Sequence, residues 1–342
     1  MLKYLLPLGL AVAGTMIADC GPAKSRADAA PHYRVAARIK GADGGWDYAS
    51  FDPVRRRLYV SRTDTIMTVD VDSGAVTAKL APASRSHIIL AIPGTAKILE
   101  TDGGTNTARI LDAVTGAELA AIPTGKGPDA AVIEPVTGLA FVMDHAGGDV
   151  TVIDTAAQTV VGTIPVGGVL EFAAADGAGR IFVNIEDKGE IAVIDARART
   201  VTGRYTLAGC EEPSGLAYAP QSKLLVAACA NGKAKVLNAA DGSEVATLTI
   251  GPRPDFAISD PGRGQVLIPS GGDGTLAVIS VANAKAVKVV QTVQTQIGAR
   301  TGTVDPKTGR VYLPTAKYLP PDKPGTRPTM VPGSFEILVV EP

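Results

Sequence analysis

Short apolar runs alternate with polar turns from about residue 32 to the end of the chain. One unit opens on a polar residue, continues through small or apolar residues, and reaches a Pro or Gly that starts a turn, as in "EFAAADG" from Glu171 to Gly177. A second and a third apolar run follow before the unit repeats. Short runs bounded by turn residues predict β-strands. Seven copies of the unit open at Asp47, His87, Asp129, Glu171, Ser214, Asp255 and Arg300.

The copies begin 40 to 45 residues apart, a period typical of propeller blades with four strands each. The last copy ends with "FEILVV" at residues 335–340 and is one strand short, while residues 32–40 precede the first copy and have no blade of their own. We therefore expect an all-β, seven-bladed β-propeller of four-stranded antiparallel blades. The N-terminal strand would complete the last blade and remove the last free sheet edge.

The second and third runs carry a recognisable pattern. "YVSR", "FVMD", "FVNI" and "YLPT" are each followed by a strand similar to V-I-D-x-x-x-G. These runs resemble the YVTN repeat, and the chain from about residue 32 to its C-terminus resembles the YncE-like periplasmic propellers. WD40-type propellers share the period, but Trp46 lies before a first strand and no Trp-Asp dipeptide closes a third strand. The resemblance implies the fold and a binding rather than a catalytic role.

The first thirty residues have the features of a targeting segment. Lys3 precedes an apolar stretch that is too short and too interrupted to span a bilayer, which predicts a signal peptide at 1–29 and no transmembrane span. Residues 30–342 would then form a single propeller domain. "ADAA" at 27–30 suits ordinary cleavage, whereas "IADCGP" resembles a lipoprotein box that would end the leader at residue 19 and lipidate Cys20. We expect a monomer in the periplasm, either free or lipid-anchored to the membrane.

Export leaves Cys210 and Cys229 in an oxidising compartment, where two cysteines usually pair. Cys210 lies in the loop before the fifth copy and Cys229 at the exit of that copy's second run, so both would lie side by side. We predict a disulfide; two free buried thiols are the alternative.

The charge distribution and the sequence motifs narrow the range of possible functions. The 33 basic and 34 acidic side chains are scattered and sum to a net charge of -1, so nucleic acid is an unlikely partner. The common catalytic motifs for nucleophiles, zinc, nucleotides and haem are absent. This absence does not exclude an enzyme, because a propeller can gather site residues one per blade.

The alternating direction of the strands places the entrance of each first strand and the exit of each second strand on one face. Polar side chains at both places would surround one mouth of the central channel, with acidic groups in excess. The alternative is structural, because short polar side chains at strand entrances cap backbone groups, and this suits Asp129 and Asp255 best. The candidate ligand-binding residues are Asp47, His87, Asp129, Glu171, Asp255, Arg300, His145, Asn184, Glu186 and Glu212.

One insertion interrupts the repeat. Residues 317–334 contain five prolines and are predicted to be stiff and extended. They would emerge on the same face and cover the mouth with Tyr318, Lys323 and Arg327, or form a solvent-exposed excursion.

These features predict a binding module for a periplasmic protein, a peptide or a small ligand, with a structural envelope role as a further possibility. Two enzymes are alternatives at the same mouth. One is a lactonase or hydrolase assisted by Ca²⁺ or another divalent metal, with Asp47, Asp129, Glu171 and Asp255 as oxygen ligands. The other is a lyase with His87 or His145 as general base and Arg300 stabilising an oxyanion.

Overall fold

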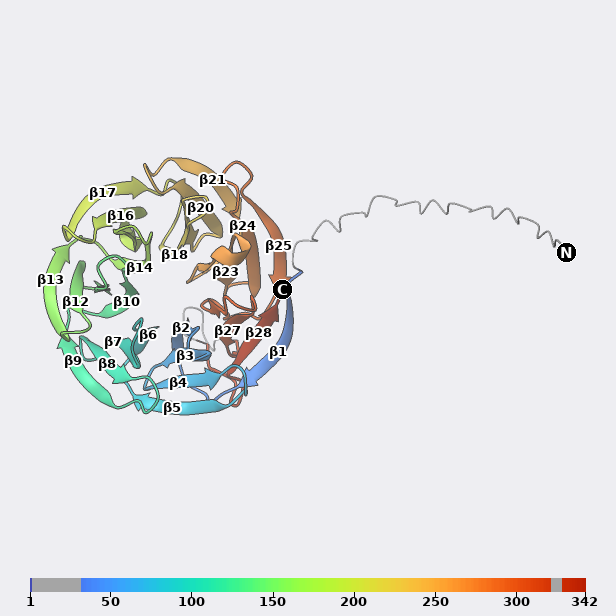
Figure 1. Ribbon diagram of the computed structural model, residues 1–342, viewed down its shortest axis with the longest axis horizontal. Helices are drawn as coiled ribbons and strands as arrows, with labels where there is room; N and C mark the ends of the chain where they lie inside the picture. The colour runs from blue at the N-terminus through green and yellow to red at the C-terminus, as the bar shows by residue number, and fades with distance from the viewer. Residues whose placement is uncertain (2–31, 321–327) are drawn as a thin grey trace. The chain divides into compact units, whose positions relative to one another are not determined.

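The structure, a computed structural model, describes Met1, residues 32–320 and residues 328–342. The described residues form seven four-stranded antiparallel sheets arranged in a ring, as Figure 1 shows. In each of the first six blades the strands follow one another in sequence from the inner to the outer side. The expected seven-bladed propeller is confirmed.

The first six blades are continuous in sequence, and their strands have the following bounds. Blade 1 contains β2 (Trp46–Asp52), β3 (Arg57–Arg62), β4 (Thr65–Asp70) and β5 (Val76–Pro82); blade 2 contains β6 (Ser86–Ala91), β7 (Lys97–Asp102), β8 (Thr107–Asp112) and β9 (Glu118–Pro123); blade 3 contains β10 (Pro128–Ile133), β11 (Ala140–Asp144), β12 (Asp149–Asp154) and β13 (Thr159–Pro165). Blade 4 contains β14 (Leu170–Ala175), β15 (Arg180–Ile185), β16 (Glu190–Asp195) and β17 (Thr200–Thr206); blade 5 contains β18 (Pro213–Ala219), β19 (Leu224–Cys229), β20 (Lys233–Asn238) and β21 (Glu244–Thr249); blade 6 contains β22 (Ile258–Asp260), β23 (Gln265–Ser270), β24 (Thr275–Ser280) and β25 (Lys288–Gln294).

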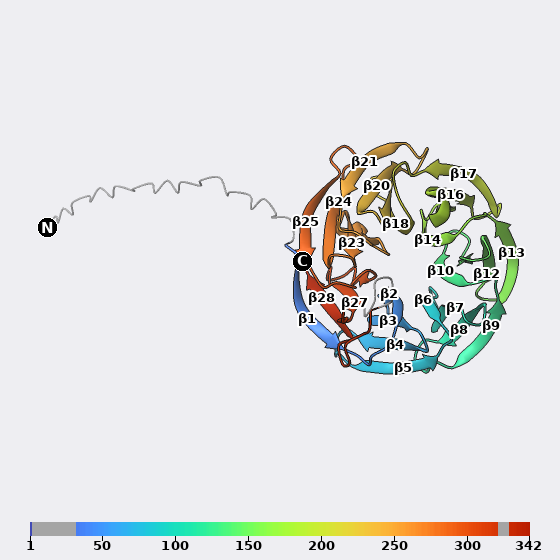
Figure 2. The same ribbon diagram turned by 180° about the vertical axis from the view of Figure 1, so that it is seen from behind.

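Both ends of the propeller domain contribute to blade 7, which contains β26 (Thr303–Val304), β27 (Val311–Thr315), β28 (Glu336–Glu341) and β1 (Arg34–Lys40). Strand β1 pairs antiparallel with β28, and Figure 2 shows the two strands side by side. The ammonium group of Lys40 lies 2.8 Å from the carboxylate of Glu336 across this pair. The predicted closure of the last blade is confirmed, and it pairs an edge of β28 that would otherwise be free.

The innermost strands of five blades begin with a β-bulge. In blade 1, Asp47 and Tyr48 lie between the pairs Trp46–Arg62 and Ala49–Val60, so two residues stand opposite one. Bulges re-aim side chains and are common beside functional sites. The same shift falls between Ser86 and Ile89, Pro128 and Ala131, Leu170 and Ala173, and Pro213 and Leu216, so each bulge contains the polar opening residue of its copy.

The innermost strands of blades 6 and 7 are shorter than the repeat predicts, and Asp255 and Arg300 precede them. Groups of these two segments also bond to neighbouring blades. The amide of Asp255 donates to the carbonyl of Arg300 at 3.3 Å, and the hydroxyl of Thr301 donates to the carbonyl of Asp47 at 2.7 Å. Pro254, directly before Asp255, has no amide to give to a regular ladder.

Burial follows the position of a strand within its blade. All six residues of β19 are buried, because blades pack against both of its faces. Strand β17 at the rim alternates between exposed and partly buried residues, as expected for a strand with one face in water. The apolar core therefore lies between neighbouring blades and leaves the channel mouths to polar residues.

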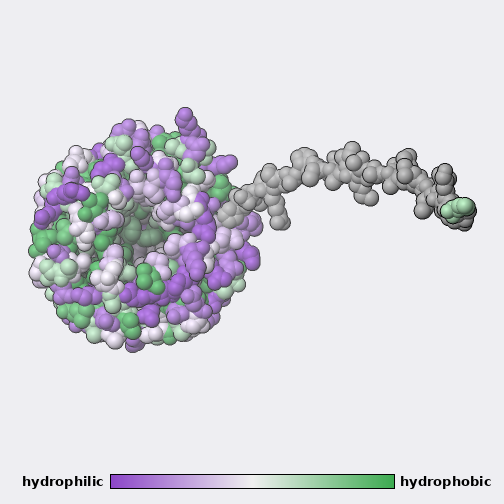
Figure 3. Space-filling view, viewed as in Figure 1, coloured by the Kyte–Doolittle hydropathy of each residue, from purple (hydrophilic) through white to green (hydrophobic). Residues whose placement is uncertain are grey.

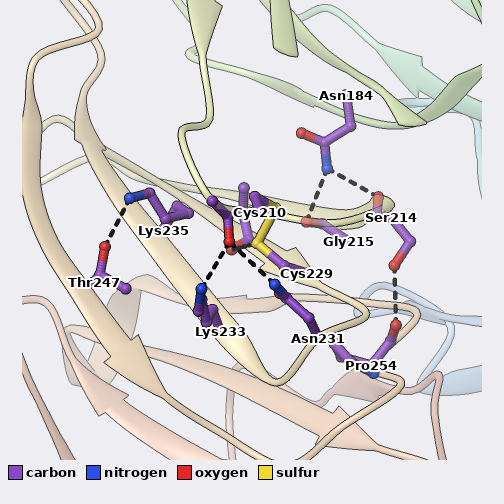
Figure 4. Close-up of a disulfide and its surroundings, with 12 residues drawn as sticks. Asn184, Cys210, Ser214, Gly215, Cys229, Asn231, Lys233, Lys235, Thr247 and Pro254 are labelled. Carbon is purple, nitrogen blue, oxygen red and sulfur yellow. Dashed lines mark hydrogen bonds between the residues drawn. A yellow bond between two sulfur atoms is a disulfide. The ribbon is translucent and has the colours of Figure 1, made fainter. Parts of the chain in front are cut away.

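A disulfide joins Cys210 and Cys229, confirming the predicted pair. Figure 4 shows it beside the entrance of β18, where Asn231 and Lys233 both donate to the carbonyl of Gly209. The bond ties the loop that leads into blade 5 to the end of that blade's second strand.

The described residues from His32 to Pro342 form one compact unit. Within the part of the chain that the structure describes, no helix has the length and hydrophobicity needed to cross a membrane. The expected leader and Cys20 lie outside the described residues.

The disulfide should stabilise the domain measurably. Cys210 and Cys229 are 19 residues apart, and crosslinking a loop of this length is expected to add about 3 kcal/mol by restricting the unfolded chain. We expect the double variant C210A/C229A to lose about that much unfolding free energy in urea. A reductant should weaken the wild type but leave the double variant unchanged. Equal stability of the two proteins would contradict the prediction.

Candidate functional site

A cavity of about 900 Å³ opens at the mouth where the innermost strands begin. Its volume lies in the range of small-molecule sites. The loops between blades and the described ends of the 317–334 insertion build its wall. Charged residues in the wall are Asp47, Arg85, His87, Glu186, Glu212, Arg253, Asp255 and Arg300, and aromatic or ring-bearing residues are Trp46, Tyr318, Pro254 and Pro328.

Three aromatic rings pack together inside the channel. The ring centroid of Tyr48 lies 5.4 Å from that of Phe172 and 5.5 Å from that of Phe256, and the two phenylalanines are 4.5 Å apart. Phe172 and Phe256 also line a second, largely apolar hollow in which residues near the far ends of the inner strands take part. Figure 3 shows a central hollow with hydrophobic residues at its depth. The three rings come from blades 1, 4 and 6 and meet between the innermost strands; two of them line the second hollow, and none is among the residues that line the charged cavity.

Sequence reasoning missed this ring cluster, although a signal for it exists. Tyr48, Phe172 and Phe256 each follow the polar opening residue of their copy directly. A regular strand would send two successive side chains to opposite faces, whereas the bulges of blades 1 and 4 let both contribute to the channel. Phe256 instead precedes the shortened strand of blade 6.

His87 joins two carboxylates from neighbouring blades. Its Nδ1 lies 2.6 Å from Asp47 Oδ2 and 2.7 Å from Asp129 Oδ1. Burial lowers the pKa of His87, but hydrogen bonds to Asp129 and Asp47 and their negative charges outweigh it and raise the pKa to about 10. Burial also raises the pKa of Asp47 to about 6. At neutral pH His87 is therefore an imidazolium held between blades 1 and 3.

A second histidine pair continues the cluster. His145 follows β11, and its Nδ1 lies 3.1 Å from Glu171 Oε1 and 3.0 Å from the carbonyl of Leu170. The hydrogen bond to Glu171 raises the pKa of His145 to about 9, and burial raises the pKa of Glu171 to about 8. Asp129 lies close enough to both to make one continuous network with the His87 pair.

On the other side of the mouth, Arg300 Nε donates to Asp255 Oδ2 at 2.6 Å. Glu186, from the 3-10 turn η1 (Glu186–Lys188), and Glu212 line the same cavity. Burial raises the pKa of Glu186, and the negative charge of Glu212 adds to this shift. The two glutamates are thus close enough to repel each other.

Asn184 stands apart from the other candidates. It is fully buried, and its amide donates to the carbonyls of Ser214 and Gly215 at 3.0 Å each, as Figure 4 shows. It therefore lies between blades 4 and 5. Most other polar residues at second-strand exits are also buried, including Asp102 and Thr315.

Other acidic side chains accept hydrogen bonds from the backbone amides at this face. Asp102 accepts the amide of Ser84 at 2.7 Å, and Asp187 accepts the amide of Val169 at 2.8 Å. Asp129 and Asp255, which suited a capping role in the sequence, contact His87 and Arg300 instead.

Sequence reasoning also missed Arg85 and Arg253 in the cavity wall. With them the wall carries four acidic side chains, from Asp47, Glu186, Glu212 and Asp255, and four basic ones, from Arg85, His87, Arg253 and Arg300. Both arginines stand two residues before an opening residue, an offset that holds Gly45, Gly127 and Gly298 in other copies. A charged residue where the repeat otherwise places glycine is the signal that could have found them.

Two overlapping groups could hold a metal ion. Asp47, His87 and Asp129 form one, and Asp129, His145 and Glu171 form the other, with the ligand atoms of each group within 4.8 Å of one another. Imidazole nitrogen with carboxylate oxygen suits a divalent transition metal, whereas Ca²⁺ takes six to eight oxygen ligands. Asp255, expected as an oxygen ligand, pairs with Arg300.

The described ends of the insertion reach the cavity. Tyr318 bridges to Met330, the amide of Leu319 donates to the carbonyl of Thr329 at 2.8 Å, and both Tyr318 and Pro328 line the wall. The ring of Tyr318 lies 6.4 Å from that of Trp46. Lys323 and Arg327, named as candidates in the sequence, lie outside the described residues.

No protein-family model matches the chain, and no curated protein matches it in sequence. Solved structures resemble it in fold. The hydrazine synthase of Kuenenia stuttgartiensis matches with a TM-score of 0.68 at 15% identity, over 86% of this chain and 97% of that chain. A chain of the mitotic checkpoint complex matches with 0.73 at 15% identity, over 98% and 99%. The WD40 repeats of RRP9 match with 0.76 at 11% identity, over 91% and 100%. Identities this low establish the propeller fold and nothing further.

The charge on His87 can be tested by titration. We expect its imidazole to remain protonated to about pH 9, because both carboxylates favour the cation. The folded pKa lies above the unfolded value of about 6.5, so its contribution to stability is complete below that pH and is lost as the pH rises through 10. At about pH 6, His87→Gln should cost roughly 3 kcal/mol.

The measurement is an NMR titration of the ring, with urea unfolding of wild type and variant across this pH range. His32→Gln, at an exposed position, is the control and should match the wild type. Titration of His87 near pH 6.5 would contradict the ion network.

Proposed function

We propose that this protein is an exported binding module whose cavity takes a small organic ligand. The observation that carries the proposal is the cavity of about 900 Å³ at the channel mouth, which eight charged side chains and the rings of Trp46 and Tyr318 line. The packed rings of Tyr48, Phe172 and Phe256 lie between the innermost strands, and we infer that they close the channel below this cavity. Deep concave sites with an apolar body and a few converging polar groups are typical of small-molecule binding.

The wall favours a small ligand over a flat protein partner. Trp46 and Tyr318 offer aromatic surface beside the charged groups, and all of these side chains face one cavity. A folded partner would reach the rim of such a pocket, whereas a small molecule would contact several of the wall residues at once. Propellers are often protein-binding scaffolds, and a protein or peptide partner at the rim is compatible with this pocket.

Export is part of the proposal. The Cys210–Cys229 disulfide is of the kind that persists in oxidising compartments. Together with the leader predicted from the sequence, it supports a periplasmic location, with a lipid anchor at Cys20 as the alternative to cleavage at 27–30.

A metal-assisted hydrolase is the second candidate, favoured by the two ligand groups that share Asp129. A metal ion bound there would lie beside the cavity and could polarise an ester or activate a water. The lyase alternative is less well supported. A histidine with a pKa of about 10 carries its proton at neutral pH, so His87 is not a ready general base.

Trp46 reports on ligand binding. It is the single tryptophan of the chain and lines the cavity. We expect fractions of a dialysable bacterial extract to change its emission in a saturable way. Thr63→Phe should weaken this response about tenfold by filling part of the cavity, while Thr159→Phe on the rim strand β13 should not. A response that is absent, or equal in both variants, would contradict small-ligand binding.

The metal candidate has a separate test. Chelator-treated protein should bind Zn²⁺ or Mn²⁺ more tightly than Ca²⁺ in calorimetry, because both ligand groups contain a histidine. Asp129→Asn should weaken binding by about tenfold or more, since this residue serves both groups. Asp64→Asn, an exposed carboxylate after β3, is the control. Undetectable binding, or binding unaffected by Asp129→Asn, would contradict a metal site at these residues.

A further inference from the structure

Three charged residues of the cavity wall adopt a backbone conformation that favours glycine. Arg85 has a φ of 64°, Glu212 of 46° and Arg253 of 56°. Each stands two residues before the opening residue of its blade, and Gly127 and Gly298 at the same offset have φ of 66° and 92°. The repeat therefore calls for a left-handed residue at this point in at least five blades.

Glycine meets this requirement without steric cost, whereas a residue with a Cβ is strained. Such strain occurs at binding sites but is not confined to them. Of the eight non-glycine residues with positive φ in the described part of the chain, five do not line the cavity: Arg56, Asn106, Gln158, Arg199 and Lys223. Lys223 is one example. It has a φ of 55° in an exposed turn between β18 and β19, away from the cavity wall. The wall residues differ because all three side chains line one cavity.

These side chains also lack partners within the described part of the chain. Arg85, Glu212 and Arg253 form no ion pair and no side-chain hydrogen bond there, and all three are exposed to solvent. Trp46 adds an independent observation. Its Nε1 donor is buried and has no acceptor among the described residues, the residue is 8% exposed, and it lines the same cavity. A buried donor without an acceptor is costly unless a ligand completes it.

The charges around the wall are ordered. Glu186 and Glu212 come from blade 4 and the entrance of blade 5, whereas Arg253 and Arg300 come from the entrances of blades 6 and 7. Arg300 gives its Nε to Asp255. Glu186 and Glu212 thus adjoin Arg253 and the Asp255–Arg300 ion pair, with Trp46 and Tyr318 beyond them; Asp47, Arg85 and His87 from blades 1 and 2 complete the wall.

We propose that the ligand is a zwitterion of short-peptide size, which deepens and rests on the proposed small-ligand function. Its oxyanion binds Arg253 and Arg300, and its ammonium group binds Glu212 and Glu186. Its body packs against Trp46, whose Nε1 donates to a ligand oxygen. A ligand with two opposite charges can pair with both the glutamates and the arginines, whereas a ligand with one charge can pair with only one of these groups.

Random tripeptides test this assignment in three forms that differ only at their ends. The first has free termini, the second is N-acetylated and lacks the ammonium group, and the third is C-amidated and lacks the carboxylate. Full-length protein retains each mixture, and mass spectrometry measures the bound fraction. We expect the free form to be retained about tenfold better than either blocked form, since each charged contact is made only by the free form.

Glycine variants assign the two ends. Arg253→Gly should remove the preference for free over amidated peptides, and Glu212→Gly should remove the preference for free over acetylated peptides. Both relieve backbone strain, so their melting temperatures should equal or exceed that of the wild type. Lys223→Gly is the matched control, which should relieve strain in the same way and leave retention unchanged.

Equal retention of the three forms, no retention of any form, or retention that survives both Arg253→Gly and Glu212→Gly would overturn the zwitterion assignment. The emission response of Trp46 to the bacterial extract separates failure of the zwitterion assignment from failure of the small-ligand function. If the response persists, the cavity binds a small ligand of another charge. If the response is absent too, the proposed function is overturned.

Discussion

The site depends on the β-bulges at the entrances of the inner strands, where two residues stand opposite one on the neighbouring strand. The bulge that contains Asp47 also contains Tyr48, and the bulge that contains Glu171 also contains Phe172. The first residue of each pair carries a carboxylate to the channel mouth, and the second contributes a ring to the aromatic cluster. In blades 1 and 4 both groups therefore depend on one backbone feature, whereas Asp255 and Phe256 precede a shortened strand in blade 6.

The charge network depends on ring closure. His87 contacts Asp47 of blade 1 and Asp129 of blade 3, and Asp255 of blade 6 contacts Arg300 of blade 7. No single blade contains a complete pair of these, so the network forms only when neighbouring blades pack. Burying such charges is favourable only while each keeps its partner. The Asp255–Arg300 pair in particular joins blades 6 and 7, so it requires the blade that both ends of the domain complete.

The period of the repeat predicted the fold, the closing strand and the Cys210–Cys229 pair, because strand order and blade length are properties of short sequence segments. It also placed Asp47, His87, Asp255 and Arg300 at one mouth. It did not predict which charges meet, because the Asp47–His87–Asp129 contacts join separate blades through side-chain geometry. Asn184 has the same sequence position as other candidates, yet its amide turns to backbone carbonyls of blade 5. A repeat specifies the backbone position of a side chain but does not specify which partner that side chain contacts.

Arg85, Glu212 and Arg253 show how a propeller can vary its chemistry at little risk to its fold. These residues lie in the loops between blades, where the hydrogen bonds of the loop set the left-handed backbone conformation. The carbonyls of Arg85, Gly127 and Arg253 each accept a hydrogen bond from a backbone amide at the exit of the following blade's second strand. The side chain at that offset takes no part in these bonds. Glycine is the least strained residue there, and a charged residue keeps the same loop while adding one group to the cavity wall. The strands then specify the ring, and the loops specify what it binds.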